Sequence, residues 1–230
     1  MKELFNEDLV FKFEKNSIVF FDLCDTLYYS NTTFDFLDFY FKDNSRYWFV
    51  RGLMNIKLVK IINKLINKVF KIDLFRLIVV LFLRKKDVQD VKIKAKLFVN
   101  QLDDKKIHIS HVILQKALNA NCKVYLVSAS LDVVVEQFYN RLNFNKYFAT
   151  SLGKNKNGTV FNGLFMNDLL GNKKEIIENL IRPETKSYFI TDNKSDYNCK
   201  DLVDYFTVIS NNRNLNYWKK KNQIYEIYEV

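Results

Sequence analysis

The residues that could do chemistry lie where apolar stretches of the sequence end. Asp22, Ser128 and Asp192 each follow a stretch rich in β-branched and aromatic side chains, as expected of buried strands. A carboxylate can attack phosphorus as a nucleophile or hold a metal ion, and a hydroxyl can bind an anion. If the three stretches are parallel strands of one sheet, their carboxyl ends meet at one edge. The sequence therefore predicts a single polar site at that edge.

A second acid extends this pattern. Asp196 follows Asp192 by four residues, in the segment ITDNKSD (residues 190–196). Carboxylate oxygens and a phosphate oxygen together suit Mg²⁺, which keeps several waters and needs few protein carboxylates. Taken alone, two acids in a solvated loop are the alternative interpretation, so the assignment depends on the rest of the sequence.

Four stretches are predicted as strands, and helical patterns lie between them. The strands cover residues 17–21, 123–127, 187–191 and 205–209, and the helices cover residues 112–121, 131–142 and 173–181. Strands that alternate with helices form a parallel sheet with helices on both faces. Residues 155–159 additionally predict the turn of a small β-hairpin.

Residues 32–102 interrupt this alternation. They show no strand-rich pattern, and residues 53–70 and 74–83 are their best helix candidates. We expect this segment to form an inserted helical cap over the strand ends. The predicted fold is thus an α/β, Rossmann-like, doubly wound parallel sheet, with residues 1–31 and 103–230 as its core and residues 32–102 as the cap domain.

The composition limits the class of protein. With 230 residues, 48% of them hydrophobic, the chain can bury a sizeable core and is not of the disordered class. The longest uncharged apolar run, residues 77–83, is too short to span a bilayer, and residues 1–8 carry acids where a secretory signal carries bases. Three cysteines without a CxxC pair indicate neither a disulfide framework nor a zinc site. We expect a cytoplasmic protein, and its net charge of +10 favours an anionic partner.

Four motifs, in this order, resemble those of the haloacid dehalogenase superfamily. They are FFDLCDTL (residues 20–27), VYLVSAS (residues 124–130), GNKKEII (residues 171–177) and ITDNKSD. The likeness is greatest to the phosphoserine phosphatases, which carry a helical cap after the first motif, and it covers about residues 18–209. It implies a phosphatase-like hydrolase that uses Mg²⁺.

The resemblance implies a role for each matching residue. Asp22 would be the nucleophile that forms an aspartyl-phosphate, and Thr26 and Ser128 would hold the transferring phosphoryl group. The implied ligands of the metal are Asp22, the backbone carbonyl of Cys24, Asp192 and Asp196. Ser130 would bind substrate at the start of the next helix, where backbone amides favour an anion. A helix-capping turn is the alternative role for Ser128 and Ser130.

The third motif offers two lysines to neutralise the charge of the nucleophile and the phosphoryl group. In the resembling family this lysine has apolar residues three and four positions later. Lys173 meets that pattern with Ile176 and Ile177. Lys174 has only Ile177 at such a spacing, which is more typical of a solvated lysine.

The sequence departs from the family at Cys24, where the resemblance calls for the general acid/base aspartate. A thiol with an ordinary pKa of about 8.5 is a poor proton donor to a leaving alkoxide and a poor base for water near neutral pH. Loss of general acid/base help typically lowers a rate by about a hundredfold to ten-thousandfold. Asp25, the next residue, is the alternative source of proton transfer.

Two positions bear on the substrate. Asn31 stands nine residues beyond Asp22, where phosphoserine phosphatases have an acid that binds the substrate ammonium, so phosphoserine itself is not the expected substrate. Arg76 is a match for the cap arginine that binds the substrate carboxylate. Its alternative role is that of a surface cation beside an apolar helix.

A basic stripe marks the predicted cap. Residues 44–72 contain seven basic residues and no acid, and lysines recur at helical spacing, namely Lys57, Lys60, Lys64, Lys68 and Lys71. A basic amphipathic helix can lie on an anionic membrane. A cap helix packed on its neighbours, with a solvated lysine face, is the preferred interpretation. Nucleic acid is disfavoured because no known binding motif accompanies the charge.

These observations lead to one main hypothesis and two alternatives. The main hypothesis is a magnesium-dependent phosphomonoesterase that acts on a small or lipid-linked phosphorylated substrate, with peripheral contact to the inner face of the membrane as an option. The first alternative is a catalytically impaired binding or regulatory protein, or a phosphotransferase. The second is a metal-independent dehalogenase, which also lacks the second acid of the first motif but does not need Asp192 and Asp196.

Overall fold

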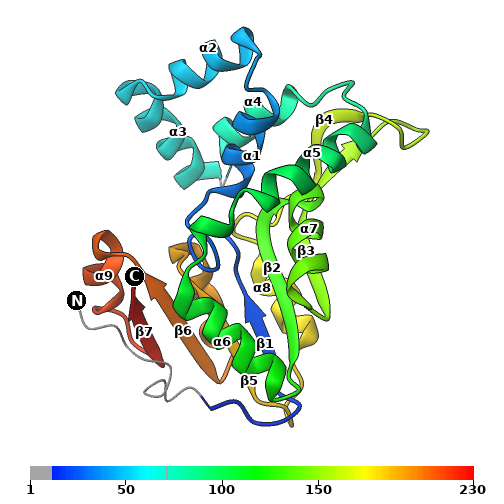
Figure 1. Ribbon diagram of the computed structural model, residues 1–230. Helices are drawn as coiled ribbons and strands as arrows, with labels where there is room; N and C mark the ends of the chain where they lie inside the picture. The colour runs from blue at the N-terminus through cyan, green and yellow to red at the C-terminus, as the bar shows by residue number, and fades with distance from the viewer. Residues whose placement is uncertain (1–11, 71) are drawn as a thin grey trace.

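The computed structural model describes residues 12–70 and 72–230, so residues 1–8 and Lys71, discussed above, lie outside the described residues. The described chain forms a seven-stranded sheet in the order β4-β3-β2-β1-β5-β6-β7 (Figure 1). Its strands are β1 (Ile18–Phe21), β2 (Lys123–Leu131), β3 (Lys146–Lys154), β4 (Phe161–Asn167), β5 (Ser187–Thr191), β6 (Tyr205–Ser210) and β7 (Glu226–Glu229). All neighbouring strands are parallel except β3 and β4, which form an antiparallel hairpin.

The central strand β1 separates two hydrophobic clusters because its side chains alternate between the faces of the sheet. Val19 and Phe21 belong to the cluster under α6 (His108–Asn119) and α7 (Asp132–Leu142). Ile18 and Phe20 belong to the cluster under α8 (Lys173–Leu180) and α9 (Asn212–Trp218). All four strand residues are at most 5% exposed. Helices on both faces of a mostly parallel sheet confirm the predicted doubly wound α/β fold.

The chain between β1 and β2 is helical, as predicted. It forms α1 (Thr32–Tyr40), α2 (Ser45–Met54), α3 (Lys57–Phe70), α4 (Leu74–Leu81) and α5 (Val88–Asn100), followed by the short 3₁₀ helix η1 (Asp103–Lys105). The prediction of one helix over residues 53–70 is wrong, since α2 ends at Met54 with Asn55 as its C-cap and α3 begins at Lys57. In Figure 1, α2 and α3 lie on the side of the molecule opposite β4 and α5.

The predicted turn at residues 155–159 is confirmed, since it joins β3 to β4. The 3₁₀ helix η2 (Lys194–Cys199) follows β5 and carries the second acid of the fourth motif. Strand β7 and helix α9 were not foreseen, because each is short and has no clear periodic pattern. Among the described residues, no helix combines the length and the apolarity that crossing a bilayer requires.

Candidate active site

Asp22 stands at the carboxyl end of β1, between β2 and β5. The register pairs Phe21 with Leu126 on one side and with Ile190 on the other, so the residue after β1 emerges between the other two predicted strand ends. The backbone amide of Asp22 donates to the Ile190 carbonyl at 2.9 Å, and its side chain is 3% exposed. Its Oδ1 accepts the Leu23 amide at 2.7 Å. The backbone thus fixes this carboxylate at the edge of the sheet.

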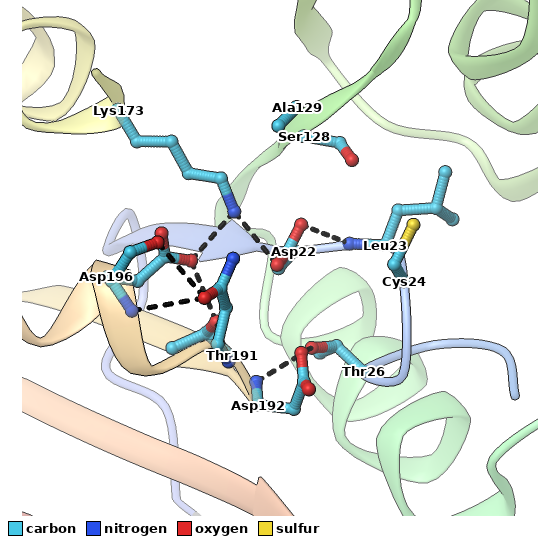
Figure 2. A network of polar contacts seen from close by, with 12 residues as sticks. Asp22, Leu23, Cys24, Thr26, Ser128, Ala129, Lys173, Thr191, Asp192 and Asp196 are labelled. Atoms are coloured by element: carbon cyan, nitrogen blue, oxygen red, sulfur yellow. Dashed lines mark hydrogen bonds and ion pairs between the residues drawn. The ribbon is translucent and has the colours of Figure 1, made fainter. Parts of the chain in front are cut away.

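Lys173 brings the third and fourth motifs to Asp22. Its Nζ lies 2.8 Å from Asp22 Oδ2 and 2.7 Å from Asp196 Oδ2, as Figure 2 shows. Burial by itself lowers the pKa of Lys173, but attraction to Asp196 and Asp22 outweighs it, so the pKa lies above its ordinary value. Lys174 points to solvent. Of the two lysines that the sequence offers, the structure places Lys173 at the predicted nucleophile.

Replacing Lys173 by methionine is expected to lower the free energy of unfolding by about 3–5 kcal/mol, because two buried carboxylates lose their cation. Burial raises the pKa of Asp196 while Lys173 lowers it, so the folded state of the variant binds this proton more tightly than the wild type does. A raised folded-state pKa gives stability that is lost as pH rises. The deficit, measured by urea unfolding, should be larger at about pH 7.5 than at about pH 5.

Lys174→Met is the matched control for that experiment. It removes a neighbouring lysine that is exposed and changes the net charge by the same amount. We expect its free energy of unfolding, measured with urea, to stay within about 0.5 kcal/mol of the wild type. Equal deficits for Lys174→Met and Lys173→Met would contradict the assignment of the buried ion pairs.

Thr26 positions Asp192 and is not among the residues that line the cleft over Asp22. Its hydroxyl accepts the Asp192 amide at 2.9 Å and donates to Asp192 Oδ1 at 3.2 Å (Figure 2). Thr26 is fully buried. These two bonds make Thr26 a residue that orients the acid of the fourth motif, and its contact with a phosphoryl group stays a prediction.

The acids at this edge outnumber the cations. Burial and then repulsion from Asp22 and Asp25 raise the pKa of Asp192 well above its ordinary range. The positive charge of Lys173 acts in the opposite direction and lowers the pKa of Asp192. Asp196 is committed differently, since its Oδ2 accepts from both Lys173 Nζ and the Thr191 hydroxyl, the latter at 2.8 Å. A further cation beside Asp192 would therefore stabilise the ionised form of this carboxylate.

These residues fit a magnesium ion. Two carboxylates and the Cys24 carbonyl form a small set of oxygen donors, and Mg²⁺ needs few protein ligands because it keeps several waters. In the described part of the chain, no group of three or more His, Cys, Asp or Glu side chains is placed to hold a metal ion, so the site offers two carboxylates and no cage of side chains. A Mg²⁺ ion held by Asp22 and Asp192 would complete its coordination with backbone oxygens and water.

The Cys24 thiol faces hydroxyl groups. Its Sγ lies 3.2 Å from Thr32 Oγ1 and 3.1 Å from Ser130 Oγ, and it accepts the Thr32 amide at 3.4 Å. Burial, and then repulsion from Asp22, raise the pKa of this thiol to about 11. The group therefore stays protonated at neutral pH. The motifs gave no sign of Thr32, whose contact depends on how α1 begins.

Asp25, the alternative source of proton transfer, lies in a turn beside the cleft over Asp22. It has a left-handed backbone with a φ of 50°, and its amide donates to the Tyr28 carbonyl at 2.8 Å. Its side chain is exposed and is absent from the lining of the cleft over Asp22. The carboxylate of Asp25 therefore lies outside the lining of the cleft, although it is close enough to raise the pKa of Asp192.

Ser128 and Ser130 both line the cleft, but the predicted place of Ser130 is wrong. Strand β2 continues to Leu131 and α7 begins at Asp132, so Ser130 belongs to the strand and not to the helix start. Its amide donates to Ser128 Oγ at 3.2 Å. The cap of α7 is Leu131, which has no side-chain hydrogen bond, so neither serine is the helix cap. Ser128 is 1% exposed and faces the end of β1 (Figure 2).

A cleft of about 140 Å³ lies over Asp22. Its walls are Asp22, Cys24, Asn31, Thr33, Phe34, Asp73, Arg76, Ser128, Ala129, Ser130, Leu170, Lys173 and Asn193. The sequence analysis gave no role to Asp73, which lies outside the motifs, or to Asn193, which lies within the fourth motif; both precede helices. Asp73 caps α4, since its Oδ1 accepts the amides of Phe75 and Arg76. Asn193 caps η2 and accepts the Ser195 amide.

Arg76 lies in the cleft wall but is not a surface cation, so that alternative is wrong. It is 5% exposed, and its Nη1 contacts the two oxygens of Asp168 at 2.8 and 3.0 Å. Its Nη2 donates to the Ala129 carbonyl at 2.6 Å. The guanidinium also lies over the Phe165 ring, 5.0 Å from the centroid. Arg76 therefore joins helix α4 to strands β2 and β4 and to the loop that follows β4.

Comparison with solved structures identifies the fold of the chain. A phospho-aspartyl intermediate analogue of phosphoserine phosphatase superposes with a TM-score of 0.60 at 16% identity, over 94% of this chain and 95% of that one. A substrate-bound phosphoserine phosphatase gives a TM-score of 0.61 at 15% identity, over 95% of both chains. The chain has the phosphoserine phosphatase fold. A hydrolase of the haloacid dehalogenase family from Salmonella enterica serovar Typhi gives a TM-score of 0.61 at 13% identity, over 94% of this chain and 67% of that one.

The phosphoserine phosphatase fold extends over nearly the whole chain, so the helices between β1 and β2 are part of the likeness. No protein-family model matches the sequence, and no curated protein sequence matches it either. At 11–16% identity the structural neighbours establish the fold, and the chemistry has to be argued from this chain's own residues.

Proposed function

We propose that this protein is a magnesium-dependent, phosphatase-like hydrolase that cleaves phosphate monoesters through an aspartyl-phosphate on Asp22. The observation that carries the proposal is the buried Asp22–Lys173–Asp196 chain of ion pairs at the floor of a cleft, with Ser128 beside it. A carboxylate held by a lysine, and facing a hydroxyl that can bind a phosphoryl oxygen, is arranged for attack on phosphorus.

The first step forms one bond and breaks one. A carboxylate oxygen of Asp22 attacks the phosphorus in line with the ester bond, the P–O ester bond breaks, and its electron pair leaves with the alcohol oxygen. Lys173 and Ser128 would stabilise the charge on the phosphoryl oxygens. In the second step, a water oxygen attacks the phosphorus, and Asp22 is released as a carboxylate together with inorganic phosphate.

Proton transfer is the weak point of both steps. The leaving alkoxide needs a proton, and the attacking water has to lose one. The Cys24 thiol, with a pKa of about 11, is too weak an acid for the first task, and as a neutral thiol it is no base for the second. We therefore expect slow turnover, with the proton supplied by solvent.

The residues that would hold Mg²⁺ are Asp22, Asp192 and the backbone carbonyl of Cys24. When bound there, the ion would neutralise charge on the phosphoryl group. Thr26 orients Asp192 for this purpose through its two hydrogen bonds. Asp196 would act on the metal site indirectly, because its Oδ2 accepts hydrogen bonds from Lys173 and Thr191.

The cleft also bears on the substrate. Asn31 lies in its wall where a carboxylate would be needed to bind an ammonium group, so we do not propose phosphoserine as the substrate. Arg76 has donors committed to Asp168 and Ala129, which leaves it poorly placed to bind a substrate carboxylate. The proposed substrates are small or lipid-linked phosphate monoesters without an amino-acid head.

The test is trapping with beryllium fluoride, a mimic of the phosphorylated carboxylate. The unfolding temperature should rise only when beryllium, fluoride and Mg²⁺ are all present, and a panel of phosphate esters should show slow release of phosphate. No shift in unfolding temperature and no turnover on the panel would exclude the phosphatase. Turnover of haloacids without metal would instead favour the dehalogenase alternative.

A second function has a specific observation in its favour. Because Cys24 cannot activate water, the aspartyl-phosphate would be long-lived, and an acceptor alcohol that brings its own base could take the phosphoryl group. This activity is phosphotransfer. It would appear as transfer of phosphate to an added alcohol in preference to water, measured as the ratio of new ester to inorganic phosphate.

A further inference from the structure

Helix α3 has one face turned toward the rest of the protein. Four residues of this face are half-buried and lie three or four positions apart or next to one another, namely Val59, Asn63, Ile66 and Asn67. No side chain of α3 is buried in the part of the chain that the structure describes. The helix therefore lies on the surface, and it is attached by this one face.

A second face of α3 is apolar and open. Five residues at helical spacing form it, and we call them the apolar stripe: Leu58, Ile61, Ile62, Leu65 and Val69. Their side chains are 46–70% exposed. Single apolar residues at the surface are ordinary, but a contiguous row of this size marks a surface that binds a partner.

The third face is basic and adjoins the apolar stripe. It consists of four exposed residues at helical spacing, which we call the lysine stripe: Lys57, Lys60, Lys64 and Lys68. At 100° per residue, Ile61 and Lys68 differ by only 20° around the helix axis, so the two stripes meet along its length. Residues 44–72 contain no acid that could neutralise these charges.

We propose that α3 docks the protein on a bilayer that contains anionic phospholipid. The helix would lie in the plane of the interface, with the apolar stripe at the boundary of headgroups and acyl chains and the lysine stripe at the lipid phosphates. A helix with separate apolar and lysine faces binds in this way, because burial of apolar area and attraction to anionic lipid act together. Because the face beside the apolar stripe is positively charged, the partner that covers the apolar stripe should be an anionic lipid surface.

Other occupants fit the two stripes less well. A second copy of the chain would bury the apolar stripe but would bring two sets of four lysines together, and like charges repel. Nucleic acid would neutralise the lysine stripe and leave the apolar stripe in water. An anionic lipid surface satisfies both stripes at once.

The attached face of α3 places the docking surface near the active-site cleft. Asn67 lines a hollow of about 240 Å³ together with Leu170 and Gly171 of the core. Leu170 is also part of the cleft wall. A docked α3 would thus hold the cleft close to the lipid surface.

Flotation of the full-length protein with vesicles tests the proposal. We expect it to float with phosphatidylglycerol-containing vesicles and not with pure phosphatidylcholine, and to be released as NaCl is raised from about 0.1 M to about 1 M. The readout is binding, so it does not depend on the proposed phosphatase activity. Absence of flotation with the anionic vesicles at the lower salt concentration would overturn the proposal.

Two variants separate the contributions of the stripes. Changing the four residues of the lysine stripe to Gln should weaken vesicle binding by on the order of a hundredfold. Changing Leu58, Ile61 and Leu65 to Ser should weaken it by at least about tenfold with all lysines intact. Both sets are exposed, so circular dichroism and the unfolding temperature should match those of the wild type.

The matched control removes four other exposed lysines, with the same change in net charge: Lys123, Lys154, Lys156 and Lys219, all to Gln. Binding within about threefold of the wild type supports the assignment to α3. An equal loss in this control would mean that net charge alone drives binding, which overturns the proposal. Sedimentation velocity supplies a further test. If the wild type is a dimer and the variant changed at Leu58, Ile61 and Leu65 is a monomer, the proposal is also overturned, because a second copy would then cover the apolar stripe.

Discussion

Replacing Cys24 by aspartate is expected to raise the rate of phosphate-ester hydrolysis by about a hundredfold to ten-thousandfold, the usual contribution of a positioned general acid/base. The side chain at this position lies in the wall of the cleft that contains Asp22. A carboxyl group there would donate a proton to the leaving alcohol in the first step. As a carboxylate it would accept a proton from water in the second.

The surroundings of Cys24 are suited to such a group. Burial and repulsion from Asp22 raise the pKa of the thiol, and both effects act in the same direction on a carboxyl group. An aspartate at this position would therefore have a pKa raised from about 3.9 toward neutrality, which suits a general acid. The hydroxyls of Thr32 and Ser130, which now contact Sγ, could orient it.

Cys24→Asn is the matched control, since it has the shape of aspartate but cannot transfer a proton. The rate of hydrolysis by Cys24→Asn should stay close to that of the wild type. In each protein, an initial burst of released alcohol would show that hydrolysis of the aspartyl-phosphate, and not its formation, limits turnover. Equal gains for the two variants would assign the effect to shape. A lower rate in Cys24→Asp than in the wild type would mean that the thiol has a role of its own.

Asp22→Asn is expected to reduce turnover of every phosphate ester to the uncatalysed background, because the amide cannot form the acyl phosphate. It should also abolish the stabilisation by beryllium fluoride and Mg²⁺. The natural pair of measurements is phosphate release on the ester panel and the unfolding temperature with and without the three components. Residual turnover above about a hundredth of the wild-type rate would contradict the assignment of the nucleophile.

Stability has to be followed in parallel for this variant. The two carboxylate oxygens of Asp22 accept from the Leu23 amide and from Lys173, whereas asparagine has one acceptor oxygen. A modest loss of stability is therefore expected, and activity should be compared well below the unfolding temperature. Cys24→Asn, measured under the same conditions, shows whether an amide in the cleft is harmful in itself.

The sequence alone was sufficient for the fold and for the centre of the site. The alternation of strands and helices identifies the sheet, because a buried parallel strand such as β1 must be apolar on both faces. Strand ends at one edge then bring Asp22, Ser128 and Asp192 together. The choice of Lys173 over Lys174 also follows from spacing, since only the former faces the core with Ile177.

Other features depend on tertiary contacts that periodicity does not encode. The commitment of Thr26 to Asp192 joins residues 166 positions apart. The contact of Ser130 with Thr32 spans 98 positions and depends on where β2 ends. Likewise, the apolar stripe of α3 could be seen in the sequence as a pattern, but whether another helix covered it could not. Local patterns predict which face is apolar and not what lies against it.

The link from Arg76 to Asp168 and Ala129 has a consequence for dynamics. Breaking the ion pair between Arg76 and Asp168 would leave a guanidinium without its partner on a side chain that is only 6% exposed. Helix α4 should therefore move with the sheet as one rigid body. If the cleft widens to admit a substrate, the parts of its wall that can move are then those from the chain before α4, such as Thr33 and Phe34.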